Sequence, residues 1–269
     1  MMKKIISLLL VVCLLAACCT VFAVDANDKA ILSEADALYL LGVFKGTDKG
    51  YELEKALTRE EGVTMILRVM GLEEEAQKSA DKCKFSDVKD WAKGYVGLGF
   101  EKGVTKGVSE TAFGFGKPLT DAMFLTMILR VLGYKDGTDF EWTAPQELAK
   151  KCGLIDSADP NEGFIRADMV DICWRLLGCK PQGSDKTIGE QLVADKAFTD
   201  AAYAEAKKVA AGTETLAEAQ KVLNPGSGDS GDSGDSGSTT GGGGGGGGFV
   251  PPVTPGGDTK IPNYETPEY

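Results

Sequence analysis

The stretch LTREEGVTMILRVMG, from Leu57 to Gly71, occurs a second time as LTDAMFLTMILRVLG, from Leu119 to Gly133. A third and weaker copy, FIRADMVDICWRLLG, runs from Phe164 to Gly178. A sequence that repeats in this way uses one structural unit several times. The repeat therefore predicts a fold built from three copies of one unit.

Each copy has the spacing of an amphipathic helix. In the first copy Val63, Ile66, Leu67 and Met70 fall at i, i+3, i+4 and i+7, so they share one helix face. The equivalent positions in the other copies are also apolar: Leu125, Ile128, Leu129 and Leu132, then Val170, Cys173, Trp174 and Leu177. We therefore predict a helix in each copy, with Cys173 and Trp174 in the core.

Capping residues mark the ends of these helices. Each copy stops at a glycine, which commonly terminates a helix. Thr58 and Glu61 have the spacing of a capping box, whereas in the second copy Thr120 keeps the cap and Met123 replaces the glutamate.

A second helix is predicted before each copy. The segments ADALYLLGVFKG, WAKGYVGLGFEKGVTKG and APQELAKKCGLIDS align on Gly42, Gly103 and Gly153. Each unit is thus a shorter helix, a glycine turn, a variable loop and a longer helix. One apolar stripe contributes about 6–12 kcal/mol, whereas ordering about 45 residues costs about 1.5 kcal/mol each. One unit should not fold alone, so we predict that the three share a core.

Composition and periodicity divide the chain into six segments. We predict a signal peptide at 1–23, repeat units at 27–72, 84–135 and 138–180, a further C-terminal helix within 186–223, and a disordered tail at 224–269. The tail is rich in glycine, serine and proline and has no hydrophobic periodicity, which is typical of a flexible chain.

The first residues have the pattern of an export signal. MMKK is followed by an apolar run from Ile5 to Leu15 and then by small residues. Two cleavage sites fit: VFA, ending at Ala23, suits ordinary signal peptidase, and LAAC, ending at Cys18, suits a lipobox that would place a lipid on Cys18. Cleavage after Ala23 is favoured because the apolar stretch continues past Cys18. No other run is long enough to span a bilayer.

Composition excludes several classes of function. The chain has no histidine, which removes His-based catalysis and His metal ligands. The four cysteines beyond the predicted signal form no CxxC pair or zinc pattern, so we expect free thiols rather than a disulfide framework. A formal net charge of −11 disfavours nucleic acid as a partner. We predict no enzyme activity, no catalytic residue, no cofactor and no metal site.

The residues of the repeat resemble the S-layer homology (SLH) family from about Asn27 to Lys180. The resemblance rests on the opening Phe85–Val88 with Trp91 and Ala92, the turns Gly42–Gly46 and Gly103–Gly107, and the helix-opening motifs Thr58–Glu61, Thr120–Met123 and Ile165–Asp168. Three such units in tandem is the usual number in that family.

This resemblance implies a pseudo-threefold, all-α bundle and non-covalent attachment of an exported protein to a Gram-positive-type cell wall. The implied partner is secondary cell wall polysaccharide, often bound through a pyruvate ketal, in grooves between the units. The family pattern implies these polysaccharide-binding residues: Arg59, Arg166, Asp87, Trp91, Gly46, Gly107 and Trp142.

The helix-opening residues carry an independent argument. Arg59 and Arg166 place a cation at a helix N-terminus, where the helix dipole disfavours it. Free N–H groups beside a forked guanidinium form a carboxylate receptor. The alternative is a solvated arginine on a surface loop. Asp121 obeys the dipole rule, so we interpret it as a helix stabiliser in a site that does not bind.

Two tryptophans and three further arginines have more than one interpretation. Trp91 and Trp142 could stack on a sugar face or fill the core. The resemblance favours the groove for Trp91 and leaves both options open for Trp142. Arg68, Arg130 and Arg175 recur at the same step of each copy, and we expect them to pair with acids or to extend to solvent at helix ends.

The sequence therefore predicts a secreted protein of the cell wall or S-layer surface that binds wall polysaccharide. One alternative is an envelope adaptor whose tail recruits another protein, and another is a lipoprotein anchored through Cys18. An enzyme is disfavoured because the repeats and the C-terminal helix occupy residues 27–223.

Overall fold

The computed structural model describes residues 26–225. The predicted signal at 1–23, the lipidation site at Cys18 and all but the first two residues of the predicted tail lie outside this range. Within it the chain is helical, with a few isolated β-bridges and no sheet. The predicted all-α class is confirmed.

Ten α-helices and one 3₁₀ helix make up the described residues. They are α2 (Ala26–Leu40), α3 (Arg59–Val69), α4 (Glu73–Gln77), η1 (Ala80–Lys82), α5 (Asp90–Glu101), α6 (Asp121–Val131), α7 (Gln146–Lys151), α8 (Arg166–Gly178), α9 (Ile188–Ala194), α10 (Asp200–Ala210) and α11 (Leu216–Leu223). None of them is long and apolar enough to cross a membrane.

The three repeated stretches form α3, α6 and α8. The first residue of each helix is the position that holds Arg59, Asp121 or Arg166. The caps are those expected. The N–H of Thr58 donates to the Glu61 carboxylate (2.8 Å), and the Thr120 hydroxyl accepts from the N–H of Met123 (3.3 Å). In the third copy, Asp168 accepts from the N–H of Ile165 (2.7 Å).

Two details of the predicted helices are wrong. The first helix of a unit is shorter than the second only in the third unit, because α2 has 15 residues and α5 has 12, whereas α3 has 11. The predicted single helix within 186–223 is three helices. Thr187, Thr199 and Thr215 each cap a new start by accepting a backbone N–H, so an Ala-, Glu- and Lys-rich composition concealed two breaks.

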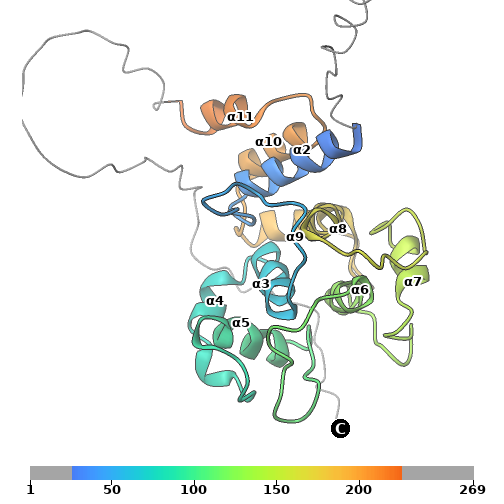
Figure 1. The fold of residues 1–269 in the computed structure, drawn as a ribbon. Coiled ribbons are helices and arrows are strands. Elements are labelled where there is room, and N and C mark those ends of the chain that lie inside the picture. Colours follow the sequence, from blue (N-terminus) through green and yellow to red (C-terminus); the bar gives the residue numbers. More distant parts are fainter. Residues whose placement is uncertain (1–25, 226–269) are drawn as a thin grey trace, which may run out of the picture.

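The apolar stripes of α3, α6 and α8 meet in one hydrophobic cluster. Ile66, Ile128 and Cys173 are fully buried within it. Figure 1 shows these helices grouped in the centre, with α2, α5 and α7 on three sides of them. Trp174 was predicted to be core but is only partly buried, because it lies between this cluster and a smaller one. The pseudo-threefold relation between units stays a prediction.

The starts of α3, α6 and α8 each lie against a loop of another predicted unit. The first unit contacts the second, the second contacts the third, and the third contacts the first. These contacts join the N–H of Arg59 to the carbonyl of Lys117 (3.1 Å), the carboxylate of Asp121 to the N–H of Asn161 (3.0 Å), and the N–H of Arg166 to the carbonyl of Lys55 (2.9 Å).

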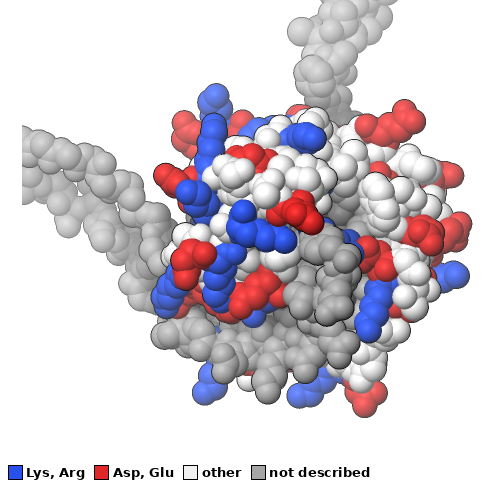
Figure 2. All heavy atoms as spheres, turned by 90° about the horizontal axis from the view of Figure 1, so that it is seen from below, with Lys and Arg blue, Asp and Glu red and all other residues white. Residues whose placement is uncertain are grey.

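The C-terminal helices cover the first helix. In Figure 1, α10 lies beside α2, and α11 lies beyond them. Ala37 and Leu40 of α2 form a second hydrophobic cluster with Ala206, Val209 and Ala219. Figure 2 shows acidic and basic side chains interspersed on the face seen from below, so any attraction for a charged ligand must be local.

Candidate functional site: two pockets between repeat units

Six of the seven predicted site residues line two pockets. Gly46, Trp91 and Arg166 line the first pocket, which has a volume of about 260 Å³. The second pocket has a volume of about 500 Å³, and its lining includes Arg59, Gly107 and Trp142. In each pocket the arginine, the glycine and the tryptophan come from three different predicted units. The sequence predicted these residues as site residues but did not predict which of them share a pocket.

In the second pocket, Arg59 reaches from α3 to the loop of the second unit. Its Nε donates to the carbonyl of Phe113 (3.2 Å) and its Nη2 to the carbonyl of Lys106 (3.1 Å). The guanidinium lies over the Phe113 ring, 4.9 Å from its centroid. Among residues 26–225, the one hydrogen-bond acceptor of Nη1 is the thioether of Met123 (3.4 Å), a weak acceptor. This nitrogen therefore keeps donor capacity for a ligand.

Burial lowers the pKa of Arg59, although the nearby carboxylate of Glu60 acts in the opposite direction. A guanidinium stays protonated in proteins in any case. Within residues 26–225, Arg59 forms no ion pair with a carboxylate, as every salt bridge of that range involves another cation. Its charge is therefore balanced only at a distance.

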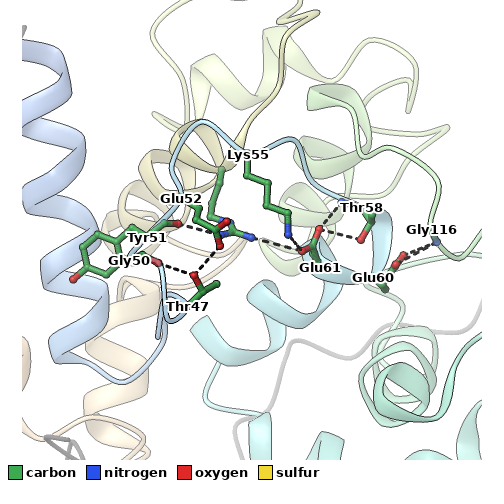
Figure 3. Close-up of polar contacts among 10 residues, drawn as sticks. Thr47, Gly50, Tyr51, Glu52, Lys55, Thr58, Glu60, Glu61 and Gly116 are labelled. Carbon is green, nitrogen blue, oxygen red and sulfur yellow. Dashed lines mark hydrogen bonds and ion pairs between the residues drawn. The ribbon is translucent and has the colours of Figure 1, made fainter. Parts of the chain in front are cut away.

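Arg166 in the first pocket is bound differently. Its Nη1 donates to the carbonyl of Tyr51 (3.0 Å), and its guanidinium lies 3.6 Å from carboxylate oxygens of both Glu52 and Glu61 (Figure 3). Only 8% of its side chain is exposed. The structure therefore surrounds this cation with its own carboxylates, which neutralise much of its attraction for an anion.

Both tryptophans lie at pocket edges. Trp91 is 53% exposed and Trp142 is 54% exposed, so neither fills the core. The ring of Trp91 is held by an edge contact with Phe115, at 6.0 Å between centroids. The backbone carbonyl of Trp142 accepts from the Thr126 hydroxyl (3.1 Å), which ties the third unit to α6. Exposed indole rings at such positions can stack on sugars.

Asp87 does not line either pocket. Its carboxylate accepts backbone N–H groups from Phe113 (2.8 Å), Gly114 (2.8 Å) and Phe115 (3.1 Å). Burial would raise the pKa of Asp87, but these hydrogen bonds outweigh it and hold the pKa below its ordinary value. Asp87 therefore fixes the loop that Arg59 contacts, and its geometry gives no support to direct ligand binding.

Arg68 and Arg130 also line the pockets, and sequence reasoning did not place them there. Arg130 donates through Nε and Nη2 to Asp136 (3.0 and 2.9 Å), which also pairs with Lys106 (3.1 Å). Burial raises the pKa of Asp136, but Arg130 and Lys106 together lower it to about 2. The predicted pairing of Arg130 with an acid is confirmed. The recurrence of an arginine at this position in all three copies could have indicated that Arg68 and Arg130 line equivalent pockets.

The first pocket repeats this arrangement. Glu73 accepts from Arg68 Nε (3.1 Å) and from Lys45 Nζ (3.1 Å). Lys45 and Lys106 each directly precede the turn glycine of their unit. Around the first pocket three carboxylates, Glu52, Glu61 and Glu73, pair with four cations, because Lys55 also contacts Glu61. Around the second pocket Asp136 alone pairs with Lys106 and Arg130, and Arg59 has no ion pair within residues 26–225. The second pocket has the larger unbalanced positive charge.

The third junction has the opposite chemistry. Asp121 is 8% exposed, and its Oδ2 accepts from Gln146 Nε2 (2.9 Å) and from the N–H of Asn161 (3.0 Å). Asp156 stands where the other units have Lys45 and Lys106, and it pairs with Arg175 at 2.8 Å. The two pockets therefore have arginine and lysine at these positions, whereas the third junction has Asp121 and Asp156, whose carboxylates already have partners within the chain.

Comparisons with known proteins were made for the whole chain. No family model matches it. The chain is 30% identical over 161 residues to a middle cell wall protein of Brevibacillus brevis, covering 57% of this chain and 15% of the relative. It is 31% identical over 190 residues to a cell surface protein of Thermoanaerobacter kivui, covering 66% and 24%. It is 31% identical over 127 residues to a surface layer protein of Brevibacillus choshinensis, covering 46% and 11%.

The chain thus spans less than a quarter of the length of these relatives. Two weaker matches are to segments of enzymes. The stronger relatives are surface proteins, and they confirm the predicted location at the surface of a Gram-positive-type bacterium. The chain is therefore similar, over about half to two thirds of its length, to proteins of the bacterial cell wall and cell surface.

Proposed function

We propose that the chain attaches non-covalently to the cell wall by binding an anionic wall polysaccharide between units of the S-layer homology type. The second pocket is the principal site. The observation that carries this proposal is Arg59, which has no carboxylate partner within the described residues and lines the same pocket as Lys106, Arg130 and the exposed ring of Trp142.

The ligand chemistry follows from the lining. A carboxylate on the sugar, such as the pyruvate ketal that the family resemblance implies, would take charge-assisted hydrogen bonds from Arg59 Nη1 and from the Lys106 ammonium. Trp142 would stack against a sugar ring at the pocket edge. Met123 and Met127 give the second pocket an apolar wall that can adapt to the ligand.

The first pocket makes a smaller contribution in this proposal. Arg166 and Arg68 already contact carboxylates of the chain, so an incoming anion must compete with them. This pocket suits neutral parts of the same polymer through the ring of Trp91. The third junction is closed by Asp121.

Two matched lysines test the proposal. Lys45 and Lys106 each precede a turn glycine and pair with one acid, and their side chains are 55% and 38% exposed. Replacing either should not disturb the core. We expect Lys106→Gln to weaken sedimentation with purified walls by up to about tenfold, and Lys45→Gln by less than about twofold.

Walls stripped of their polysaccharide provide the second arm of this experiment, and they should lose binding of the wild-type protein. Undiminished binding to stripped walls would show that the polymer is not the ligand. A larger effect of Lys45→Gln than of Lys106→Gln would show that the principal pocket is wrongly assigned.

A further inference from the structure

Two cysteines meet where α7 and α8 end. Cys152 follows the last residue of α7, and Cys179 follows the last residue of α8. The Sγ of Cys179 lies 3.2 Å from the backbone carbonyl oxygen of Cys152. Standard bond lengths then place the Cα of Cys152 within about 5.6 Å of that sulfur. A bond between the two sulfurs would therefore need side-chain rotation together with a small shift of the two helix ends.

The other two described cysteines differ from this pair. Cys83 precedes α5, and its thiol contacts the carbonyl of Phe85 at 3.8 Å. Cys173 is fully buried in α8. Neither has a recorded contact with another cysteine within residues 26–225, so both serve as internal controls.

The members of the pair differ in access. Cys152 is partly exposed, whereas Cys179 is 8% exposed. Burial raises the pKa of Cys152, an effect that a hydrogen bond with Tyr134 partly offsets. Burial raises the pKa of Cys179 to about 11, and the neighbouring Cys152 contributes in the same direction. A soluble reagent should therefore reach Cys152 first, and the reaction should be faster at alkaline pH.

We propose that Cys152 and Cys179 are a modification site, at which a small-molecule disulfide outside the cell converts two thiols into an intramolecular disulfide. The Cys152 thiolate attacks the reagent, forming a mixed disulfide and releasing one reagent thiol. The Cys179 thiolate then attacks the Cys152 sulfur and releases the second. The two protein thiols are oxidised, the reagent disulfide is reduced, and the two protons pass to the departing thiolates.

This site is separate from the wall-binding pockets, since no cysteine lines either of them. The bond would close a loop that contains α8 and would join the ends of the two helices of the predicted third unit. Closing such a loop restricts the unfolded chain and stabilises the fold. Oxidation should raise the melting temperature without changing wall binding, so this proposal and the proposed function can fail independently.

The experiment uses the full reduced chain, with Cys13, Cys18 and Cys19 replaced by serine so that they do not react, and oxidised glutathione at mildly alkaline pH. Mass spectrometry should show the loss of two hydrogen atoms with no glutathione retained, and peptide mapping should show Cys152 linked to Cys179. Cys179→Ser should keep one glutathione on Cys152, because the resolving thiol is missing. Cys83→Ser should react as the wild type does.

Three results would overturn the proposal. One is a wild-type product that stably retains glutathione, and another is a link that involves Cys83 or Cys173. The third is an absence of reaction until denaturant is added. The wild-type peptide map decides between these outcomes even where a variant folds poorly.

Discussion

Replacing Arg59 by alanine should change both binding and stability, by amounts that can be measured separately. The side chain donates to two carbonyls of the second unit and lies over the Phe113 ring. Losing these contacts should cost about 2–3 kcal/mol of unfolding free energy, since hydrogen bonds from charged donors contribute about 1.5–3 kcal/mol and water partly replaces them here. The unfavourable position of Arg59 in the helix dipole would by itself predict that Arg59→Ala loses almost no stability, because that argument omits these two contacts.

The binding term is estimated from Nη1, the nitrogen whose one acceptor among the described residues is a thioether. A charge-assisted contact between this group and a ligand carboxylate contributes about 1.5–3 kcal/mol, or about ten- to a hundredfold in affinity. Arg59→Lys should restore only part of the binding, because the single nitrogen of an ammonium cannot reproduce the planar fork whose separate nitrogens reach the two carbonyls and the ligand.

The assay is sedimentation with purified walls at a temperature where circular dichroism shows that every variant is folded. Arg175→Ala is a control for the loss of an arginine outside the two pockets, since Arg175 lines neither of them and pairs with Asp156 and Asp171. We expect the control to bind as the wild type does. If folded Arg59→Ala also binds as tightly as the wild type, Arg59 holds the units together and does not contact the polymer.

Three further substitutions test the closed third junction, the buried ion pair of the second pocket and a buried carboxyl of α2. Asp121→Ala removes acceptors for three donors and should cost about 2–3 kcal/mol in urea unfolding without weakening wall binding; weaker binding would mean that the third junction is not closed. Asp136→Asn leaves Arg130 buried without its carboxylate and should cost about 3 kcal/mol, and a melting temperature like that of the wild type would refute this. Burial, and then the charge of Asp171, raise the pKa of Glu34 to about 7. Because this folded pKa lies above the unfolded value, wild-type stability should fall by about 1–2 kcal/mol between pH 4.5 and 7, allowing for solvent screening. Glu34→Gln should remove that fall, and an unchanged pH profile would show that Glu34 is not responsible.

The sequence predicted most of the fold because its signals are local. The stripe of α3 is visible at Val63, Ile66 and Leu67, and the cap at Thr58 fixes where that helix begins. The breaks before α10 and α11 depend on single threonines in a strongly helical composition. Propensity summed over a window does not detect such breaks.

The candidate site was predicted residue by residue but not as pockets. Arg166 and Gly46 are far apart in sequence, and only the contacts between units bring them together. The role of Asp87 as a loop clamp depends on three N–H groups that no side-chain pattern reveals. The low net charge of the first pocket arises because Glu52 and Glu61 face Arg166 across a predicted unit boundary.

The packing of α2 against α10 and α11 has a consequence for how the chain folds. The first described helix completes its hydrophobic contacts only with the last ones, so these contacts have a large separation in sequence. Such contacts slow folding because a long loop must close before they form. A chain that emerges from the ribosome amino end first therefore cannot finish its structure until its carboxyl-terminal helices have been made. Residues 200–223 therefore decide when the exposed face of the first described helix is finally covered.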